Sequence, residues 1–246
     1  MFISIIIPAY NEEKNIKKGV LNEVAKYLKT VNFKWEVVLV DDGSTDKTLS
    51  LLNKFTDNNR GFRVLSQPHR GKGGTVIAGM LTAVGDWRIF LDFDQATPIS
   101  EIVKILPKFN QDYGVVIGTR TGREGAPIVR KLMAYGFMVL RNLILRLPYR
   151  DTQCGFKAFS KKAAGEIFGK LKRYKDKVAA SGAAVTVGFD LEILYLARKL
   201  KYKVAEVPVL WHHKDTERIS PFKDSVRGLI DLFKVRLNAS AGKYKI

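Results

Sequence analysis

The sequence predicts an α/β fold in which a mostly parallel sheet carries helices on both faces. Short apolar runs alternate along the chain with longer amphipathic segments, which is the order produced by βαβ units. The runs are too apolar to be half exposed, so we expect strands that are buried on both faces. The chain has 246 residues, enough for one substantial core, and we expect a single domain over residues 1–246.

The elements of the first half are defined by apolar runs and by the residues that bound them. The expected strands are Phe2 to Ile7, Trp35 to Val40, Phe62 to Leu65, Ile89 to Leu91 and Tyr113 to Gly118. The expected helices are Glu12 to Lys29, Ser44 to Leu52 and Thr75 to Val84. Asn11 and Ser44 are of the residue types that cap helix N-termini, and we expect them to do so here.

The second half contains two helix-like segments in which cations lie beside apolar residues. Ile128 to Leu147 is apolar around most of its circumference and has cations at its edges, which suits a core helix and a membrane-interface helix equally. Phe222 to Leu237 starts after Pro221 and has an apolar stripe beside cations, so it is expected to be a basic amphipathic helix. The other expected elements are the strands Gly155 to Phe159 and Val204 to Leu210 and the helix Phe189 to Leu200.

The formal net charge of +18 is concentrated in the second half. Residues 1–119 have 15 Lys and Arg against 13 Asp and Glu, whereas residues 120–177 have 15 against 4 and residues 198–246 have 12 against 5. This asymmetry favours an anionic partner, either a nucleic acid or a membrane surface, although a solvated lysine-rich surface would also produce it. No nucleic-acid module or basic face with interleaved aromatic residues is recognisable, so no specific nucleic acid is expected.

The cellular compartment is predicted from three further observations. Cys154 is the single cysteine, which excludes an intramolecular disulfide and suits a reducing compartment. Met1 leads directly into a strand-like run, so we expect no signal peptide. The longest helix-like apolar stretch, Leu132 to Leu140, is shorter than the roughly 20 residues that span a bilayer. A cytoplasmic protein that does not cross a membrane is therefore expected.

The segment from Arg88 to Pro98 contains the most informative candidate site. Its apolar run brings Asp92 and Asp94 to the C-terminal end of a strand, two residues apart and therefore on one face. Such close like charges repel unless a cation lies between them, and Mg²⁺ typically takes one or two carboxylates plus phosphate oxygens. The pair alone is no better evidence for a metal site than for a solvated strand end.

A glycine-rich stretch at residues 70–74 lies before the predicted helix at Thr75. It lacks the spacing of a phosphate-binding P-loop, so a tight turn at a helix N-terminus is the preferred interpretation. Lys72 within this stretch is still placed to face a diphosphate.

Eight motifs, in this order, resemble the family 2 glycosyltransferases of the GT-A fold and, more narrowly, the polyprenyl-phosphate hexosyltransferases. They are IIIPAYNEEKNI, VLVDDGSTD, GKGG, LDFDQATP, GTR, DTQCGFKAF, GFDLEILYLARK and EVPVLWHH. The resemblance extends from Ile5 to about Arg236. Asp151 to Lys157 is more similar to dolichyl-phosphate glucosyltransferases than to dolichyl-phosphate mannose synthases. The fold implied is GT-A, with a nucleotide-binding half at 1–119 and an acceptor-binding, membrane-interface half at 120–246.

The resemblance also implies where the sugar nucleotide binds, with Tyr10 against the base and Asp42 at its polar edge. Asp92 and Asp94 would hold Mg²⁺ or Mn²⁺, which bridges the diphosphate of UDP-glucose or GDP-mannose. Some mannose synthases have a glutamine two positions after the second aspartate, where this chain has Ala96 and places Gln95 one residue early. The expected nucleotide-sugar residues are Pro8, Ala9, Tyr10, Glu12, Asp42, Lys72 and Asp92.

For the acceptor, the resemblance implies a polyprenyl-phosphate lipid whose phosphate attacks the sugar with inversion. Arg120 and Arg130 would grip this phosphate, and Lys157 and Arg218 are further candidates. A lipid phosphate is already anionic, so the reaction needs positioning and charge stabilisation rather than removal of a proton. The expected catalytic residues are Asp94, Arg120, Arg130 and Asp190. Asp190 would be a general base for an alcohol acceptor and would otherwise orient a neighbouring cation.

The function expected from these observations is a metal-dependent transfer of a hexose, with UDP-glucose favoured as donor, to polyprenyl or dolichyl phosphate. The enzyme would be peripheral on the cytoplasmic face of a membrane. One alternative is a dolichyl-phosphate mannose synthase that uses GDP-mannose, and another is a family 2 enzyme acting on a polysaccharide or protein. A nucleotidyltransferase is disfavoured, because Pro8 to Glu13 occupies the place of its glycine-rich, arginine-containing loop. His212 and His213 are left out of the expected metal ligands.

Overall fold

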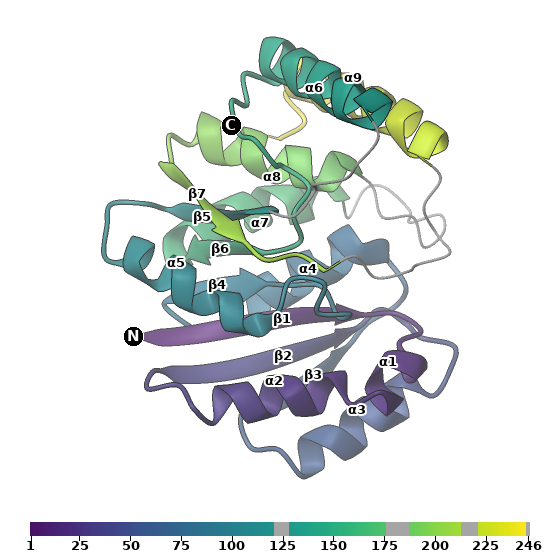
Figure 1. Ribbon diagram of the computed structural model, residues 1–246, viewed down its shortest axis with the longest axis vertical. Coiled ribbons are helices and arrows are strands. Elements are labelled where there is room, and N and C mark those ends of the chain that lie inside the picture. Colours follow the sequence, from purple (N-terminus) through teal and green to yellow (C-terminus); the bar gives the residue numbers. More distant parts are fainter. Residues whose placement is uncertain (121–127, 176–186, 213–220, 245–246) are drawn as a thin grey trace.

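The computed structural model describes residues 1–120, 128–175, 187–212 and 221–244. Its seven strands form one sheet in the order β3-β2-β1-β4-β6-β5-β7 (Figure 1). Strand β6 runs antiparallel to β4 and β5, and all the other pairs are parallel. The strands are β1 (Phe2–Ala9), β2 (Lys34–Asp41), β3 (Phe62–Ser66), β4 (Trp87–Phe90), β5 (Val115–Arg120), β6 (Lys157–Ser160) and β7 (Val204–Val209). The predicted mostly parallel α/β sheet is confirmed.

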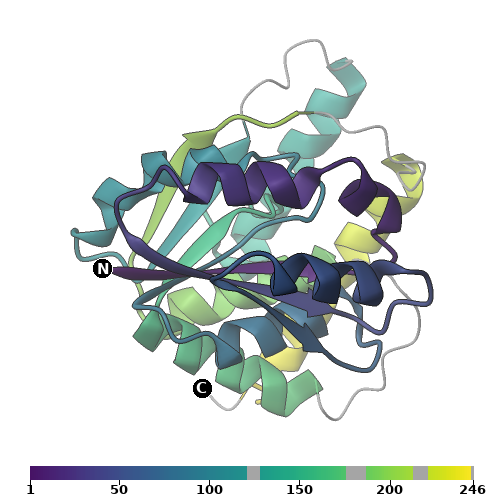
Figure 2. The same cartoon turned by 90° about the horizontal axis from the view of Figure 1, so that it is seen from below.

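Helices cover both faces of this sheet (Figure 2). They are α1 (Glu13–Lys17), α2 (Val20–Leu28), α3 (Thr48–Asp57), α4 (Gly71–Thr82), α5 (Ile102–Phe109), α6 (Ile128–Leu145), α7 (Lys161–Lys175), α8 (Val187–Lys199) and α9 (Pro221–Ser240), with a 3-10 turn η1 (Ile99–Glu101) before α5. Alternating side chains of β1 enter different cores, because Ile5 and Ile7 pack with α2 and α5 while Ile6 packs with α4. The strands are therefore buried on both faces, as their composition predicts.

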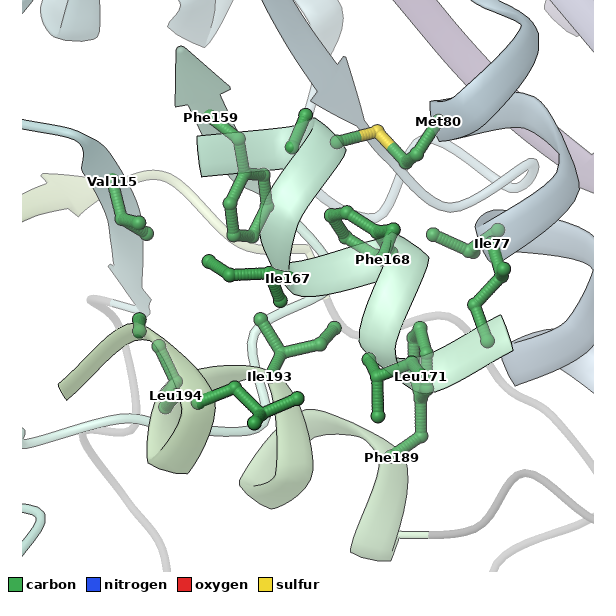
Figure 3. Close-up of a cluster of buried hydrophobic side chains, with 14 of the residues drawn as sticks. Ile77, Met80, Val115, Phe159, Ile167, Phe168, Leu171, Phe189, Ile193 and Leu194 are labelled. Carbon is green, nitrogen blue, oxygen red and sulfur yellow. The ribbon is translucent and has the colours of Figure 1, made fainter. Parts of the chain in front are cut away.

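The core on the second face is built from three helices that meet beneath the sheet. Helix α7 lies between α4 and α8, with Phe168 of α7 in the middle of the cluster (Figure 3). The Phe168 ring also packs edge-on against Phe159 of β6, with ring centroids 5.1 Å apart. This packing fixes α4 and α8 relative to the sheet, and the N-terminal ends of both helices supply residues to the candidate site described below.

Helices α6 and α9 form an outer layer at one end of the molecule, next to α8 (Figure 1). In the part of the chain that the structure describes, no helix is both long enough and apolar enough to cross a membrane.

The predicted continuous helix from Glu12 to Lys29 is wrong. The chain forms α1 and α2 instead, and Gly19 between them has a φ of 84°, in the left-handed region that a glycine adopts without strain. A helix cannot continue through that conformation, so the direction of the chain changes there.

The predicted caps at Asn11 and Ser44 are also wrong. Asn11 Oδ1 accepts a hydrogen bond from the backbone N–H of Thr45 at 2.9 Å, and Ser44 Oγ accepts one from the backbone N–H of Asn11 at 3.0 Å. These two side chains tie together the loops that follow β1 and β2. Helix α3 starts only at Thr48, whose backbone N–H donates to Asp46 Oδ1.

One more expectation about local structure fails, and two helices were not predicted. Strand β4 ends at Phe90, so Asp92 and Asp94 lie on the turn that follows, and their proximity does not come from strand alternation. Helices α5 and α7 have no counterpart among the expected elements.

Helix α4 packs so closely on the sheet that one position tolerates only glycine. A Cβ at Gly79 would lie 2.5 Å from Ile6 Cγ2 and 2.9 Å from Val40 Cγ2. We expect Gly79→Ala to lower the free energy of unfolding by about 1–2 kcal/mol, because the overlap outweighs the helix propensity gained. Urea denaturation measures this. The matched control is Gly165→Ala in α7, where a Cβ meets nothing within 4 Å and should stabilise the protein; equal effects of the two changes would contradict the prediction.

Candidate functional site

The candidate site lies along the edge of the sheet where the parallel strands end. Asp42 follows β2, Asp92 follows β4 and Arg120 is the last residue of β5. Because β6 runs antiparallel, its first residue, Lys157, lies at this same edge, opposite Phe90 in the strand register. The topology thus gathers charged residues that are far apart in the sequence, at the edge where ligands of such sheets bind.

The carboxylate of Asp42 is bound to the N-terminus of α4. Its Oδ1 accepts the backbone N–H of Arg70 at 2.8 Å, and its Oδ2 accepts that of Gly71 at 2.9 Å. The partial positive charge of a helix N-terminus stabilises a carboxylate in this position. Gln67 Nε2 also donates to Asp42 Oδ1, at 3.3 Å. Asp42 therefore joins the loop after β2 to the start of α4, and its buried carboxylate accepts several hydrogen bonds from this region.

Tyr10 lies beside this junction and stacks on His69, with ring centroids 4.3 Å apart and an interplanar angle of 26°. His69 Nδ1 is 3.0 Å from the backbone oxygen of Asp42. Glu12, which follows Tyr10 in the same loop, donates its backbone N–H to Thr48 Oγ1 at 2.7 Å. The residues expected at the nucleoside are thus gathered in one region, together with His69, to which the sequence analysis gave no role.

Lys72 and Asp92 form an ion pair between the first turn of α4 and the turn after β4. Lys72 Nζ donates to Asp92 Oδ1. Burial alone would lower the pKa of Lys72, but the carboxylates of Asp92, Asp190 and Asp94 outweigh it, and the pKa is raised. Burial would likewise raise the pKa of Asp92, yet Lys72, Lys157 and Arg120 hold this pKa below its usual value. Both groups are therefore charged at neutral pH.

Asp92 also lies in close contact with Gly155. A Cβ at Gly155 would overlap Asp92 Oδ2, so only glycine leaves space for the carboxylate. Asp94 Oδ1 accepts the backbone N–H of Ala96 at 2.9 Å. Gln95 has a φ of 53°, and its side chain bonds the backbone of Asp92 and Ile99, so the amide maintains the shape of the turn.

Lys157 and Asp190 form a buried ion pair behind Asp92. Lys157 is 0% exposed, and its Nζ donates to Asp190 Oδ1 at 2.6 Å and to the backbone oxygen of Cys154. Asp190 lies in the first turn of α8. In this arrangement the Lys157 side chain is not accessible to a phosphate, and its ammonium is paired with the Asp190 carboxylate.

Arg120 forms a bidentate ion pair with Asp151. Its Nε donates to Asp151 Oδ2 at 2.6 Å and its Nη2 to Oδ1 at 2.9 Å. The guanidinium also lies over the ring of Trp211, 5.6 Å from the centroid. The fork pairing fixes the plane of the guanidinium, and Asp151 uses two of its five N–H groups.

Some predicted residues fall outside what the structure describes. Arg130 belongs to α6, but its side chain is not described, and Arg218 and His213 lie outside the described residues altogether. His212 is exposed and donates its backbone N–H to Ala96 O at 2.8 Å, which joins the segment after β7 to the turn after β4. Sequence reasoning gave no role to Asp151 or Gly155, although both lie inside the DTQCGFKAF motif.

The residues present fit a magnesium-like or manganese-like ion that binds together with a phosphate ligand. Within the described residues, no three His, Cys, Asp or Glu side chains gather into a cluster able to cage a metal ion. Asp92 and Asp94 offer carboxylate oxygens only, and Mg²⁺ commonly binds through one or two carboxylates and the phosphates of its substrate. The ammonium of Lys72 on Asp92 shows that this carboxylate accepts a cation.

The chain resembles known glycosyltransferases in sequence and in fold. It is 32% identical to the dolichyl-phosphate beta-glucosyltransferase of Dictyostelium discoideum, over 100% of this chain and 77% of that protein. It is 34% identical to the protein of the same name from Drosophila melanogaster, over 99% of this chain and 77% of that protein. Glucosyl-3-phosphoglycerate synthase from Mycobacterium tuberculosis, solved with Mn²⁺, UDP-glucose and phosphoglyceric acid, shares the fold with a TM-score of 0.61 at 20% identity, covering 96% of this chain and 79% of that one.

Residues 4–168 match the family described as glycosyl transferase family 2. This match contains most of β1 and all of β2 to β6 and, with them, Asp42, Asp92, Asp94, Arg120 and Lys157. The full-length similarity to the dolichyl-phosphate beta-glucosyltransferases extends the relationship to α8 and α9. The chain is therefore a glycosyltransferase that belongs to family 2 and has the GT-A fold.

Proposed function

We propose that this enzyme transfers glucose from UDP-glucose to the phosphate of a polyprenyl (dolichyl) lipid at a membrane surface, with inversion at the anomeric carbon. The observation that carries the proposal is the similarity, over essentially the whole chain, to proteins named dolichyl-phosphate beta-glucosyltransferases. The charged edge of the sheet supports it, because it offers separate groups for a nucleotide, a diphosphate and a second phosphate.

The donor site is assigned to the loops after β1, β2 and β4. Tyr10 and Asp42 lie together at the junction with α4, where the nucleoside would bind along Pro8, Ala9 and Glu12. Lys72 in the first turn of α4 is placed for the diphosphate, since both its ammonium and the helix N-terminus favour an anion.

Asp92 and Asp94 would hold the divalent metal. When bound, this metal supplies positive charge that stabilises the nucleoside diphosphate as it leaves the sugar. Gly155 and Lys72 both contact Asp92, so the carboxylate is positioned before the donor arrives. Mn²⁺ in the related glucosyl-3-phosphoglycerate synthase structure is consistent with this role.

The acceptor phosphate is assigned to Arg120, with Arg130 and Arg218 as further cations. Asp151 holds the guanidinium of Arg120 in a fixed orientation beside Trp211. The N–H groups that Asp151 does not use would therefore already be oriented to donate hydrogen bonds to the lipid phosphate. The phosphate oxygen attacks the sugar carbon while the bond to the donor diphosphate breaks. Charge moves from one phosphate to the other, and no proton has to be removed from the nucleophile.

Asp190 is assigned a positioning role rather than that of a general base. Its Oδ1 accepts a hydrogen bond from the buried ammonium of Lys157, so the two groups hold each other in place. An anionic acceptor such as a lipid phosphate requires no base, which is compatible with this positioning role.

The outer surface of α6 and α9 is assigned to the membrane. Eight of the 12 large hydrophobic side chains found exposed in the described residues belong to these two helices, namely Tyr135, Val139, Leu140, Leu143, Val226, Ile230, Phe233 and Leu237. The exposed cations Arg146, Lys234 and Arg236 accompany them. A mixture of exposed apolar groups and cations suits the interface of an anionic leaflet, with the enzyme peripheral on the cytoplasmic face.

The donor proposal is tested by thermal shift with UDP-glucose or GDP-mannose, each with and without Mn²⁺. We expect UDP-glucose with Mn²⁺ to stabilise the wild type by on the order of 2.7 kcal/mol at a ligand concentration 100-fold above Kd. Asp94→Asn should remove the part of this stabilisation that depends on Mn²⁺, whereas the control Asp57→Asn at the end of α3 should keep the full stabilisation. A Mn²⁺-dependent shift with GDP-mannose alone would instead assign a mannosyl donor.

The positioning role of Asp190 is tested through stability. Asp190→Asn leaves the buried Lys157 ammonium without its charge partner and should lower the free energy of unfolding by about 3–5 kcal/mol. In urea denaturation, adding Lys157→Met to this variant should recover part of the loss, because the uncompensated charge is removed. The exposed ion pair of Asp112 and Lys203 is the control, and Asp112→Asn should change stability little. Strictly additive effects of the two core substitutions would contradict the assigned pairing.

The membrane assignment is tested by co-sedimentation with phosphatidylserine-containing vesicles. Leu143 and Leu237 are 72% and 69% exposed, and their joint replacement by Gln should weaken binding by roughly tenfold for each side chain that enters the interface. The control replaces Val84 and Val103, which are 57% and 58% exposed on other elements, by Gln and should leave binding unchanged. Equal loss in both double variants would refute a membrane role specific to α6 and α9.

A further inference from the structure

The Lys72–Asp92 pair has a consequence for how the metal and the donor bind. A Cβ at Gly155 would overlap both carboxylate oxygens of Asp92, and one of these oxygens, Oδ1, accepts the hydrogen bond from Lys72 Nζ. The amine therefore occupies one of the two oxygens that Asp92 can offer to another cation. A metal ion and the Lys72 ammonium compete for the same place.

The charges around this pair are nearly balanced without a metal ion. The carboxylates of Asp92, Asp94 and Asp190 all act on Lys72, and the ammonium of Lys157 acts on Asp92 from the buried side. A divalent ion arriving alone would add two positive charges beside two ammonium groups, one of which would lose its hydrogen-bond acceptor. Repulsion between like charges at this distance is substantial in a partly buried site.

A nucleoside diphosphate changes this balance. It brings negative oxygens that can accept hydrogen bonds from an ammonium. Lys72 lies in the first turn of α4, and its four-carbon side chain is flexible. The ammonium can therefore leave Asp92 for a phosphate when the donor binds, which frees Oδ1 for the metal ion.

We propose that Lys72 serves as an internal cation that occupies Asp92 in the free enzyme, so that the divalent metal binds weakly by itself and tightly only together with a nucleoside diphosphate. The inference rests on the metal site of the proposed function and adds a coupling between its two ligands. By linkage, the metal strengthens nucleotide binding by the same factor. An enzyme without bound nucleotide would thus bind the metal ion only weakly.

The test is a titration with Mn²⁺ alone, in which the electron paramagnetic resonance signal of free Mn²⁺ reports the unbound ion. Lys72→Met removes the competing charge and should bind Mn²⁺ about tenfold more tightly than the wild type, within the range usual for coupled sites. Lys72→Arg retains the charge and should bind as weakly as the wild type. Lys54→Met, an exposed lysine of α3, controls for the loss of one positive charge and should have no effect.

Repeating the titrations with saturating UDP separates this inference from the function on which it rests. The wild type should then bind Mn²⁺ at least about tenfold more tightly than without UDP, and the advantage of Lys72→Met should disappear. If UDP strengthens Mn²⁺ binding to the wild type but Lys72→Met binds Mn²⁺ alone no better, the inference is overturned and the proposed function stands. If the wild type binds no Mn²⁺ even with UDP, both are overturned.

A second measurement needs no variant. Acetylation of Lys72 by acetic anhydride, followed by mass spectrometry of the wild type, reports how accessible its amine is. Saturating Mn²⁺ should release the amine from Asp92 and increase its labelling, while labelling of Lys54 stays constant. Unchanged labelling of Lys72 at saturating Mn²⁺ would overturn the inference whatever the behaviour of the variants.

Discussion

The positive N-terminal end of α4 is the feature on which the rest of the site depends. Carboxylates that end buried strands need positive partners, and this one helix supplies them to two strands. Its first backbone N–H groups bind Asp42 after β2, and the Lys72 side chain in its first turn binds Asp92 after β4. The helix in turn is held by close contact of Gly79 with β1 and β2 and by packing against α7. The geometry of the proposed donor site is therefore tied to the core.

The side of the site that we assign to the acceptor is organised by a different pair of charges. Lys157 and Asp190 neutralise each other in the interior, and this buried pair joins the start of β6 to the start of α8. Arg120 and Asp151 repeat the arrangement nearer the surface, where the guanidinium is fixed in plane. Each half of the site thus has a cation from one element held by a carboxylate of another, and this pairing keeps long basic side chains in defined positions.

Much of the fold could be predicted from the sequence, because its signals are local. Apolar runs and their bounding residues located all seven strands to within a few residues, and the alternation with helices gave the parallel class. The missed features depend on non-local contacts. Asn11 and Ser44 are typical capping residues, yet each bonds the opposite loop, and this preference appears only once β1 and β2 are paired. Helix α7 is an exception, because Ala164, Ile167, Phe168 and Leu171 recur at the helical spacing in the sequence and all four are buried in the core.

The candidate site likewise has features that the sequence predicts and features that depend on non-local contacts. Asp92 and Asp94 could be recognised from the sequence because two neighbouring carboxylates are typical metal ligands. The ammonium that pairs with Asp92 could not, because Lys72 lies 20 positions earlier in the chain. Lys157 was expected at a phosphate because its motif resembles a family pattern. The sequence does not reveal that it is fully buried, since this follows from the antiparallel direction of β6.

The antiparallel direction of β6 also limits where insertions and deletions can occur in this chain. Successive side chains of a strand point to opposite faces of its sheet, so one extra residue within β6, directly after Lys157, would turn Lys157 away from Asp190. Strand β6 is hydrogen-bonded on both sides, to β4 and to β5, and cannot shift to compensate without breaking both ladders. Residue identities at the start of β6 can vary within limits of size, but insertions and deletions there would be excluded among functional relatives.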